Sequence, residues 1–186
     1  MENEKKIIAI DAMGGDRGPA AVLGGINQFL YQHPESNIHF HIFGDEARLR
    51  KLLARYARVA RNSTIIHAPG IIRGTDKVRD VIRHATDTSM YMAIKDVREG
   101  NAAAVVSAGN TGVLMSLSKL ALKTVDGISR PAITTMLPSG AGDSRVVVLD
   151  LGAMLNAMRV ICLTLRFWAG FMPRLLVTCR ARNLAF

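Results

Sequence analysis

The chain has 186 residues, 49% of them hydrophobic, and its 24 Lys and Arg outnumber 15 Asp and Glu to give a formal net charge of +9 at pH 7. This length and apolar content predict one domain that buries a core. No run reaches the roughly 18 uninterrupted apolar residues of a membrane-spanning helix, and residues 1–10 lack the apolar core of a secretory signal, so we expect a cytoplasmic protein.

Short apolar runs and segments of helical periodicity alternate over the first 150 residues. Residues 6–10 (KIIAI) have the composition of a central parallel strand that is buried on both faces. A helix is expected to begin at Gly18 and Pro19, because proline suits the first helical turn. Its buried stripe is predicted to comprise Val22, Leu23, Ile26, Phe29 and Leu30.

The next elements follow the same alternation. Residues 38–43 and 63–67 are predicted strands, and between them a basic amphipathic helix is expected from residue 45 to about residue 59. The predicted inward residues of that helix are Leu49, Leu52 and Leu53. A polar loop is expected at 68–88, with a helical turn or two at 76–84.

The last predicted elements complete the fold class. Thr88 or Ser89 is expected to cap a helix that ends at Gly100. Strands are predicted at 102–106, 131–137 and 145–151, with a helix after residue 112. The inward residues of these two helices are predicted to be Met90, Ala93, Ile94 and Val97, and Leu114, Leu117, Leu120 and Ala121. This order of elements predicts an α/β domain with a mostly parallel sheet.

A glycine-rich loop follows the first predicted strand. Residues 11–19 read DAMGGDRGP. Glycines permit a close approach of backbone N–H groups to an anion, and the helix that follows adds partial positive charge. Asp11 and Asp16 could orient a donor or bind a cation, with Gly14 and Gly15 forming the turn between them. The alternative is a βα turn that needs glycine only for its geometry.

A second loop of this kind follows the strand predicted at 102–106. Its residues are Ser107, Ala108, Gly109, Asn110, Thr111 and Gly112. Asn110 and Thr111 place side-chain donors at a helix start, and the small residues leave room for a ligand. Neither loop has the Walker A pattern or the G-x-G-x-x-G pattern, so we expect no nucleotide cofactor. Ligands of parallel sheets bind at the carboxyl ends of strands, which is where both loops lie.

Other polar residues suggest weaker hypotheses. His39 and His41 fall on one side of a strand and could form a metal pair, but no third ligand is evident and we predict no metal. Ser107 lacks the G-x-S-x-G context of a triad nucleophile. A basic helix face comprises Arg48, Arg50, Lys51, Arg55, Arg58 and Arg61. That face is either a solvated surface or a docking site for an acidic protein or anionic lipid.

Several motifs together resemble one family. They are residues 11–19, Thr88-Ser89-Met90, Glu99-Gly100, residues 106–112 (VSAGNTG), residues 127–132 (GISRPA) and residues 148–153 (VLDLGA). Their order and spacing resemble those of the PlsX family, the bacterial phosphate acyltransferases of phospholipid synthesis, across residues 5–153.

The resemblance implies a Rossmann-like α/β/α sandwich, similar to phosphotransacetylases. It also implies transfer of an acyl group from acyl carrier protein to inorganic phosphate, without a cofactor, by a cytoplasmic homodimer that can associate peripherally with the membrane. We expect catalytic roles for Asn110 and Asp11. We expect substrate and phosphate to be bound by Gly14, Gly15, Asp16, Ser107, Gly109, Thr111 and Gly112. Phosphate can attack the thioester directly, since residues 1–153 contain no cysteine nucleophile.

The chain departs from the family pattern after Ala153. Met154 stands where relatives have Asn, and His84-Ala85 stands where Lys or Arg is common. Residues 154–186 contain five Arg, both cysteines, the single Trp and no acid, whereas residues 1–153 hold 19 basic and all 15 acidic residues. We therefore expect residues 1–153 to be the N-terminal part of the acyltransferase domain. We expect residues 154–186 to be a non-family tail produced by a frameshift, leaving a poorly soluble, inactive chain.

Three alternatives remain open. The tail could instead be native and serve membrane contact. The enzyme could be a phosphotransacetylase-like enzyme that uses acyl-coenzyme A. The chain could also be a basic, non-catalytic protein that binds nucleic acid or membrane. The net charge of only +4 over residues 1–153 argues against a nucleic-acid partner.

Overall fold

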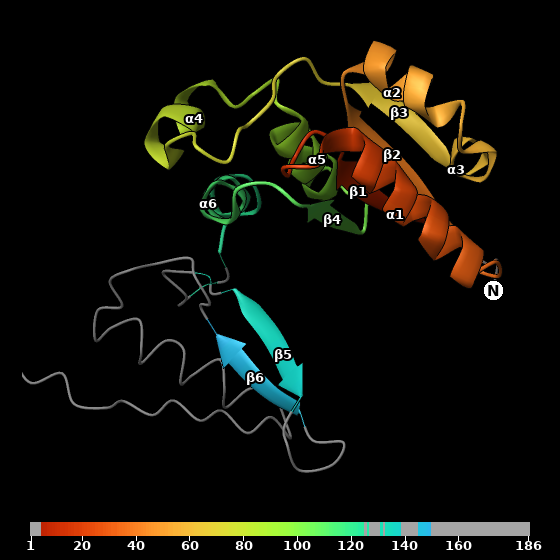
Figure 1. The fold of residues 1–186 in the computed structure, drawn as a ribbon. Helices are drawn as coiled ribbons and strands as arrows, with labels where there is room; N and C mark the ends of the chain where they lie inside the picture. Colours follow the sequence, from red (N-terminus) through yellow and green to blue (C-terminus); the bar gives the residue numbers. More distant parts are fainter. Residues whose placement is uncertain (1–4, 125, 127–130, 132, 139–144, 150–186) are drawn as a thin grey trace, which may run out of the picture. The chain divides into compact units, whose positions relative to one another are not determined.

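A computed structural model gives the fold of residues 5–124, 126, 131, 133–138 and 145–149 (Figure 1). The chain divides into two compact units, residues 1–123 and 124–186, which we describe separately. The tail predicted at 154–186 lies outside the described residues. No helix within the described residues is long and apolar enough to cross a membrane.

The first unit is a parallel sheet flanked by helices, which confirms the predicted α/β class. Its strands are β1 (Lys6–Asp11), β2 (Ile38–Gly44), β3 (Ser63–His67) and β4 (Ala104–Ser107). They lie in the order β3-β2-β1-β4, and every pair is parallel. The helices are α1 (Gly18–Gln32), α2 (Glu46–Leu53), α3 (Ala57–Arg61), α4 (Val78–His84), α5 (Ser89–Arg98) and α6 (Thr111–Leu122).

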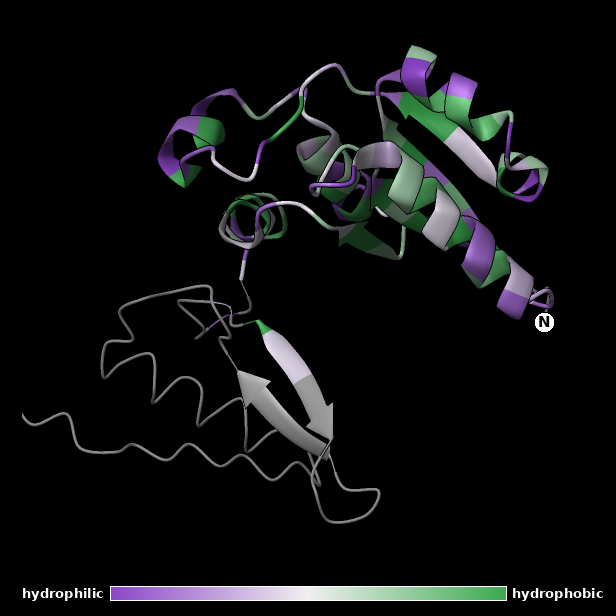
Figure 2. Ribbon diagram, viewed as in Figure 1, coloured by the Kyte–Doolittle hydropathy of each residue, from purple (hydrophilic) through white to green (hydrophobic). Residues whose placement is uncertain are grey.

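Alternation along β1 divides the core between two faces of the sheet. Ile8 and Ile10 pack with the apolar stripes of α1, α2 and α3 in one cluster. Ile7 and Ala9 pack with Ala93 and its neighbours on α5 in another. Successive side chains of a strand point to opposite faces, so β1 is buried on both sides, as its sequence predicts. The helices carry both hydrophobic and hydrophilic residues, as helices with one buried face do (Figure 2).

The segment between α2 and α3 corrects one prediction. A single helix was expected over 45–59, but α2 ends at Leu53 and α3 begins at Ala57. The N–H groups of Arg55 and Tyr56 bond to carbonyls three residues back, which closes the first helix. Tyr56 then packs against the core beside α1, so tertiary burial overrides the continuous helical pattern.

The end of the unit shows two smaller corrections. The strand predicted at 102–106 begins and ends later, as β4 at Ala104–Ser107. In α6 the buried residues are Val113, Leu117 and Ala121, whereas Leu120 is 59% exposed. These buried residues are spaced by four, because α6 packs only one narrow side against α4 and α5.

The second unit contains an antiparallel pair in the part that is described. β5 (Thr134–Pro138) pairs with β6 (Arg145–Leu149) in register from Thr134 opposite Leu149 to Pro138 opposite Arg145. β5 begins three residues later than the strand predicted at 131–137, and β6 begins at residue 145, as predicted. Six residues separate them, and a parallel crossover needs a dozen or more, so the connection length itself favours a hairpin.

Candidate functional site

The site begins at the carboxyl ends of β1 and β4, which lie side by side. Asp11 and Ser107 are register partners at those ends. Ala9 on β1 and Val105 on β4 face α5. Asp11 and Ser107 each lie two residues further along the same strand, so their side chains point to the same face of the sheet. The two glycine-rich loops, defined as residues 11–19 and 107–112, therefore begin next to each other.

Asp11 is a buried hub of hydrogen bonds. Asp11 is only 2% exposed. One carboxylate oxygen, Oδ1, accepts from the N–H groups of Met13 and Gly14 at 3.2 Å each and from the Ser89 hydroxyl at 2.6 Å. The other oxygen, Oδ2, accepts from the Ser107 hydroxyl at 2.6 Å. Both oxygens are thus occupied by protein donors, as a buried carboxylate requires.

The start of α5 supports this carboxylate. Ser89 is the first residue of α5, and Thr88 caps the helix by accepting a hydrogen bond from the N–H of Tyr91, as predicted. The helix N-terminus carries partial positive charge and lies beside the Asp11 carboxylate. Two hydroxyls, two backbone N–H groups and a helix N-terminus thus surround the buried Asp11 side chain.

The two loops also touch each other. A Cβ atom on Gly14 would lie 2.6 Å from Asp11 Oδ2 and 2.8 Å from the backbone nitrogen of Gly109. Gly109 donates its N–H to the Ser107 hydroxyl oxygen at 3.1 Å. Gly15 has a φ of +85°, a backbone conformation that favours glycine. Only glycine lets the first loop approach the second this closely.

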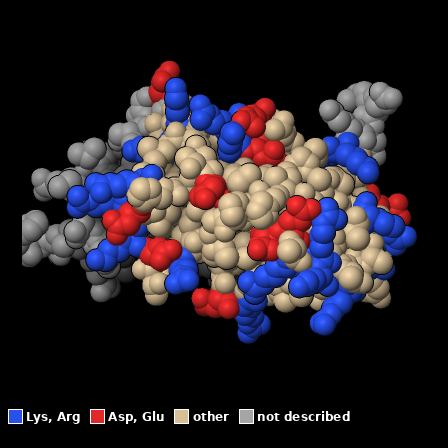
Figure 3. Space-filling view, turned by 90° about the horizontal axis from the view of Figure 1, so that it is seen from above, with Lys and Arg blue, Asp and Glu red and all other residues tan. Residues whose placement is uncertain are grey.

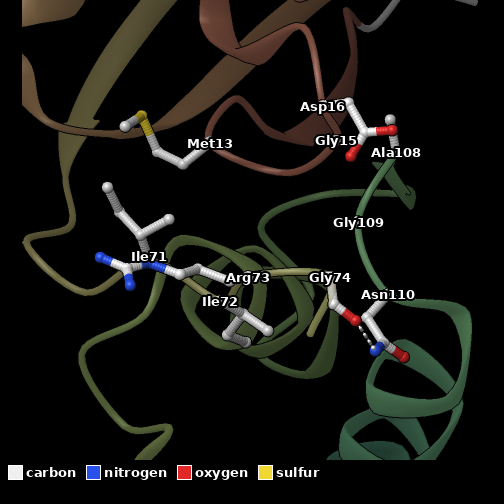
Figure 4. Close-up of a pocket in the computed structure, with 10 residues that line it drawn as sticks. All are labelled: Met13, Gly15, Asp16, Ile71, Ile72, Arg73, Gly74, Ala108, Gly109 and Asn110. Atoms are coloured by element: carbon white, nitrogen blue, oxygen red, sulfur yellow. Dashed lines mark hydrogen bonds between the residues drawn. The ribbon is translucent and has the colours of Figure 1, made fainter. Parts of the chain in front are cut away.

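A cavity of about 430 Å³ lies beside the two loops (Figure 4). Its lining residues are Met13, Gly15, Asp16, Ile71, Ile72, Arg73, Gly74, Ala108, Gly109 and Asn110. The wall that faces the loops comes from residues 71–74, which follow β3. This volume falls within the roughly 300–1,000 Å³ of small-molecule sites.

Asn110 joins the start of α6 to the opposite wall of the cavity. Its carbonyl oxygen accepts from the N–H of Val113 at 3.1 Å and caps α6. Its amide nitrogen donates to the carbonyl oxygen of Gly74 at 3.0 Å, the bond drawn in Figure 4. Thr111 and Gly112 are the first residues of α6, where backbone N–H groups have no acceptor within the helix.

The structure brings all nine predicted site residues to this edge of the sheet. Four of them line the cavity: Gly15, Asp16, Gly109 and Asn110. Asp11, Gly14 and Ser107 lie behind the cavity wall and hold the loops together, while Thr111 and Gly112 begin α6. Whether any of them contacts a substrate stays a prediction.

Sequence reasoning missed Ser89 as part of the site and missed residues 71–74 altogether. Residues 71–74 follow β3, and the carboxyl ends of parallel strands share one edge, so topology would have placed them here. Their sequence, Ile-Ile-Arg-Gly, matches no ligand-binding motif. Gly70 is fixed at the base of this segment by a parallel bridge to Thr88.

The histidine pair has a structural role in the described residues. His41 Nδ1 lies 2.7 Å from Asp96 Oδ2, and His39 Nε2 lies 2.9 Å from the hydroxyl of Thr64. No group of three or more metal-ligating side chains occurs within the part of the chain that the structure describes. These contacts connect β2 to β3 and to α5.

The basic face predicted on the helix after β2 is divided between α2 and α3. Arg50 pairs with Glu46 at 2.6 Å, and the guanidinium of Arg58 lies over the ring of Tyr31 at 5.3 Å. Figure 3 shows Lys and Arg interspersed with Asp and Glu on the face that it displays. Mixed charge of this kind is typical of a solvated surface.

Comparison with known proteins gives consistent matches. Residues 6–159 match the family described as fatty acid synthesis protein. A phosphate acyltransferase of Azorhizobium caulinodans is 45% identical over 151 residues, which cover 81% of this chain and 41% of the relative. One of Maricaulis maris is 44% identical over 146 residues, covering 78% and 41%. One of Rhodospirillum centenum is 44% identical over 154 residues, covering 83% and 42%.

The parallel sheet and the paired glycine-rich loops at its strand ends define an α/β protein with a cavity at the carboxyl edge of the sheet, where ligands of such sheets bind. The chain belongs to the fatty acid synthesis protein family, as the match over residues 6–159 shows. It spans about two fifths of the length of the curated relatives that it matches.

Proposed function

We propose that this chain contributes the phosphate-binding loops of a phosphate acyltransferase, which transfers an acyl group from acyl carrier protein to inorganic phosphate in phospholipid synthesis. The observation that carries the proposal is the joining of two glycine-rich loops by Asp11, next to a cavity at the strand ends. The names of the relatives support the chemistry.

The reaction needs an anion site and an oxyanion site. A phosphate oxygen attacks the thioester carbonyl, a C–O bond forms, and the carbonyl oxygen gains negative charge. Collapse of this intermediate breaks the C–S bond and releases the carrier thiolate, which takes up a proton. Acyl phosphate and free carrier protein are the products. Fixed donors near both oxygens accelerate such a step by positioning and by charge stabilisation.

The residues of the two loops fit distinct parts of this task. Thr111 and Gly112 begin α6, where backbone N–H groups have no acceptor within the helix and partial positive charge favours an anion. Asn110 lines the cavity and fixes the opposite wall. Asp11 holds both loops from behind, and its occupied oxygens favour a positioning role over contact with substrate.

We propose that residues 1–153 form the acyltransferase portion, that residues 154–186 are a frameshifted tail, and that residues 1–186 alone turn over no substrate. In the complete enzyme we propose a cytoplasmic homodimer with peripheral membrane association.

A chimera tests this function. Residues 6–153 of this chain would replace the matching segment of the Azorhizobium caulinodans relative, and acyl phosphate would be trapped with hydroxylamine. We expect turnover by the chimera with acyl carrier protein as acyl donor, little turnover with acyl-coenzyme A, and none by the 186-residue chain. A chimera with native-like circular dichroism but no turnover with either donor would contradict the proposal, and efficient use of acyl-coenzyme A would favour a phosphotransacetylase-like enzyme.

A further inference from the structure

We propose that Arg73 is the cationic residue that recognises a phosphate group bound in the cavity. This inference rests on the proposed function and adds a specificity residue outside the two loops. Arg73 is the only basic residue among the ten that line the cavity. It belongs to the wall supplied by residues 71–74, opposite Gly109 and Asn110 (Figure 4).

The acidic residue in the cavity favours a cation on the facing wall. Asp16 lines the same cavity, and its carboxylate would repel an incoming phosphate. Backbone N–H groups and a helix N-terminus supply partial charges only. A full positive charge on the facing wall offsets Asp16, and a guanidinium can bind two phosphate oxygens at once.

The Arg73 side chain is available for this role. It is exposed and forms no ion pair within the described part of the chain. In Figure 4 it extends beside Ile71, on the side of the cavity away from Asn110. A phosphate bound between the loops and Arg73 would therefore be contacted from two opposite walls of the cavity.

The backbone around Arg73 is fixed although its side chain is exposed. The Arg73 N–H donates to Asp76 Oδ2 at 2.8 Å, and the Asp76 N–H donates back to the carbonyl of Arg73 at 3.1 Å. The next residue, Gly74, accepts the amide of Asn110. These bonds hold the Arg73 Cα at the cavity, which lowers the entropy lost when the side chain binds an anion.

The size of the cavity leaves two sources for the phosphate group. About 430 Å³ exceeds what inorganic phosphate alone requires. The group recognised by Arg73 is therefore either inorganic phosphate itself or a phosphate on the arm that carries the thioester. Both present at least two free phosphate oxygens to a guanidinium, so a binding experiment with two probes separates them.

The experiment titrates the 186-residue chain with inorganic phosphate and, separately, with 4′-phosphopantetheine, using calorimetry. Arg73→Ala is compared with Arg73→Lys and with Arg79→Ala, a control that removes an exposed arginine of α4 outside the cavity. We expect Arg73→Ala to weaken binding of one probe roughly tenfold or more, Arg73→Lys to weaken it less, and Arg79→Ala to leave it unchanged.

The outcomes separate the two proposals. A loss confined to one probe identifies the source of the phosphate group and supports the inference. Wild-type affinity of Arg73→Ala for both probes overturns the inference while the proposed function stands. Failure of the wild-type chain to bind either probe, with a native-like spectrum, counts against the phosphate site itself and so against both.

Discussion

At the scale of single residues, the site depends on a carboxylate that no substrate need touch. Asp11 accepts hydrogen bonds from two serine hydroxyls and two backbone N–H groups, and it is buried. Hydrogen bonds to a charged group are stronger than neutral ones, and a buried polar group left unpaired is costly. The carboxylate therefore contributes to stability as well as to the geometry of the loops.

Asp11→Asn tests this contribution. The amide keeps the size of the side chain but removes its charge and places an N–H₂ group opposite either Ser89 or Ser107, whose hydroxyls now donate. We expect the free energy of unfolding to fall by about 2 kcal/mol, measured by urea denaturation of the 186-residue chain. Asp16→Asn, an exposed change on the same loop, should alter it by less than about 0.5 kcal/mol. Equal effects of the two variants would refute a structural role for Asp11.

At the scale of secondary-structure elements, Asn110 couples α6 to the segment after β3. Its side chain caps α6 through Val113 and bonds to Gly74 at the same time. One amide thus sets both the start of a helix and the position of the opposite cavity wall. The two functions use different atoms, so substitutions can separate them.

Asn110→Ala and Asn110→Asp form that pair of substitutions. Alanine removes both bonds, and we expect a loss of about 1–2 kcal/mol in unfolding free energy. Aspartate retains the acceptor that caps α6 but cannot donate to Gly74, so we expect Asn110→Asp to keep most of the unfolding free energy that Asn110→Ala loses. Hydrogen exchange of residues 71–77 should be faster than in the wild type for both variants. Unchanged exchange in Asn110→Asp would show that the bond to Gly74 does not hold the wall.

The elements also show how far sequence reasoning reaches. Strands β1, β2 and β3 and helix α1 lie where periodicity and turn residues predict them, because local pattern and burial agree there. The break between α2 and α3 follows from burial of Tyr56, which no local pattern contains. Residues 71–74 join the site only through strand order, and Ser89 joins it only through a contact 78 residues away. Such long-range information is absent from a motif.

At the scale of the whole molecule, stability depends on pH through His39. Burial, then the positive charge of Lys5 and then that of His41, lower the pKa of His39 below its usual 6.5. Its Nδ1 atom is buried without a partner, while Nε2 lies 2.9 Å from Thr64 Oγ1. The folded state therefore binds a proton on His39 less readily than the unfolded state does.

The sign of the effect follows from that difference. The stability associated with neutral His39 is fully present above pH 6.5 and declines as the pH falls through the lowered pKa. We expect His39→Gln, which can still bond to Thr64, to flatten the decline in unfolding free energy between about pH 7 and pH 5. His84→Gln, an exposed change on α4, should leave the profile as it is. An identical slope in both variants would assign the pH dependence to other groups.

The hydrogen bonds of Asp11 also bear on the order of events during folding. Asp11 is separated from Ser89 by 78 residues and from Ser107 by 96 residues. Contacts across such distances form late, because the intervening chain must first lose its loop-closure entropy. Both glycine-rich loops are held by this one carboxylate, so we expect them to become ordered together. A nascent chain that has not yet reached residue 107 can pair β1 with β2 and β3, but Asp11 then lacks the Ser107 hydroxyl, so we expect the two loops to be joined only when β4 docks beside β1.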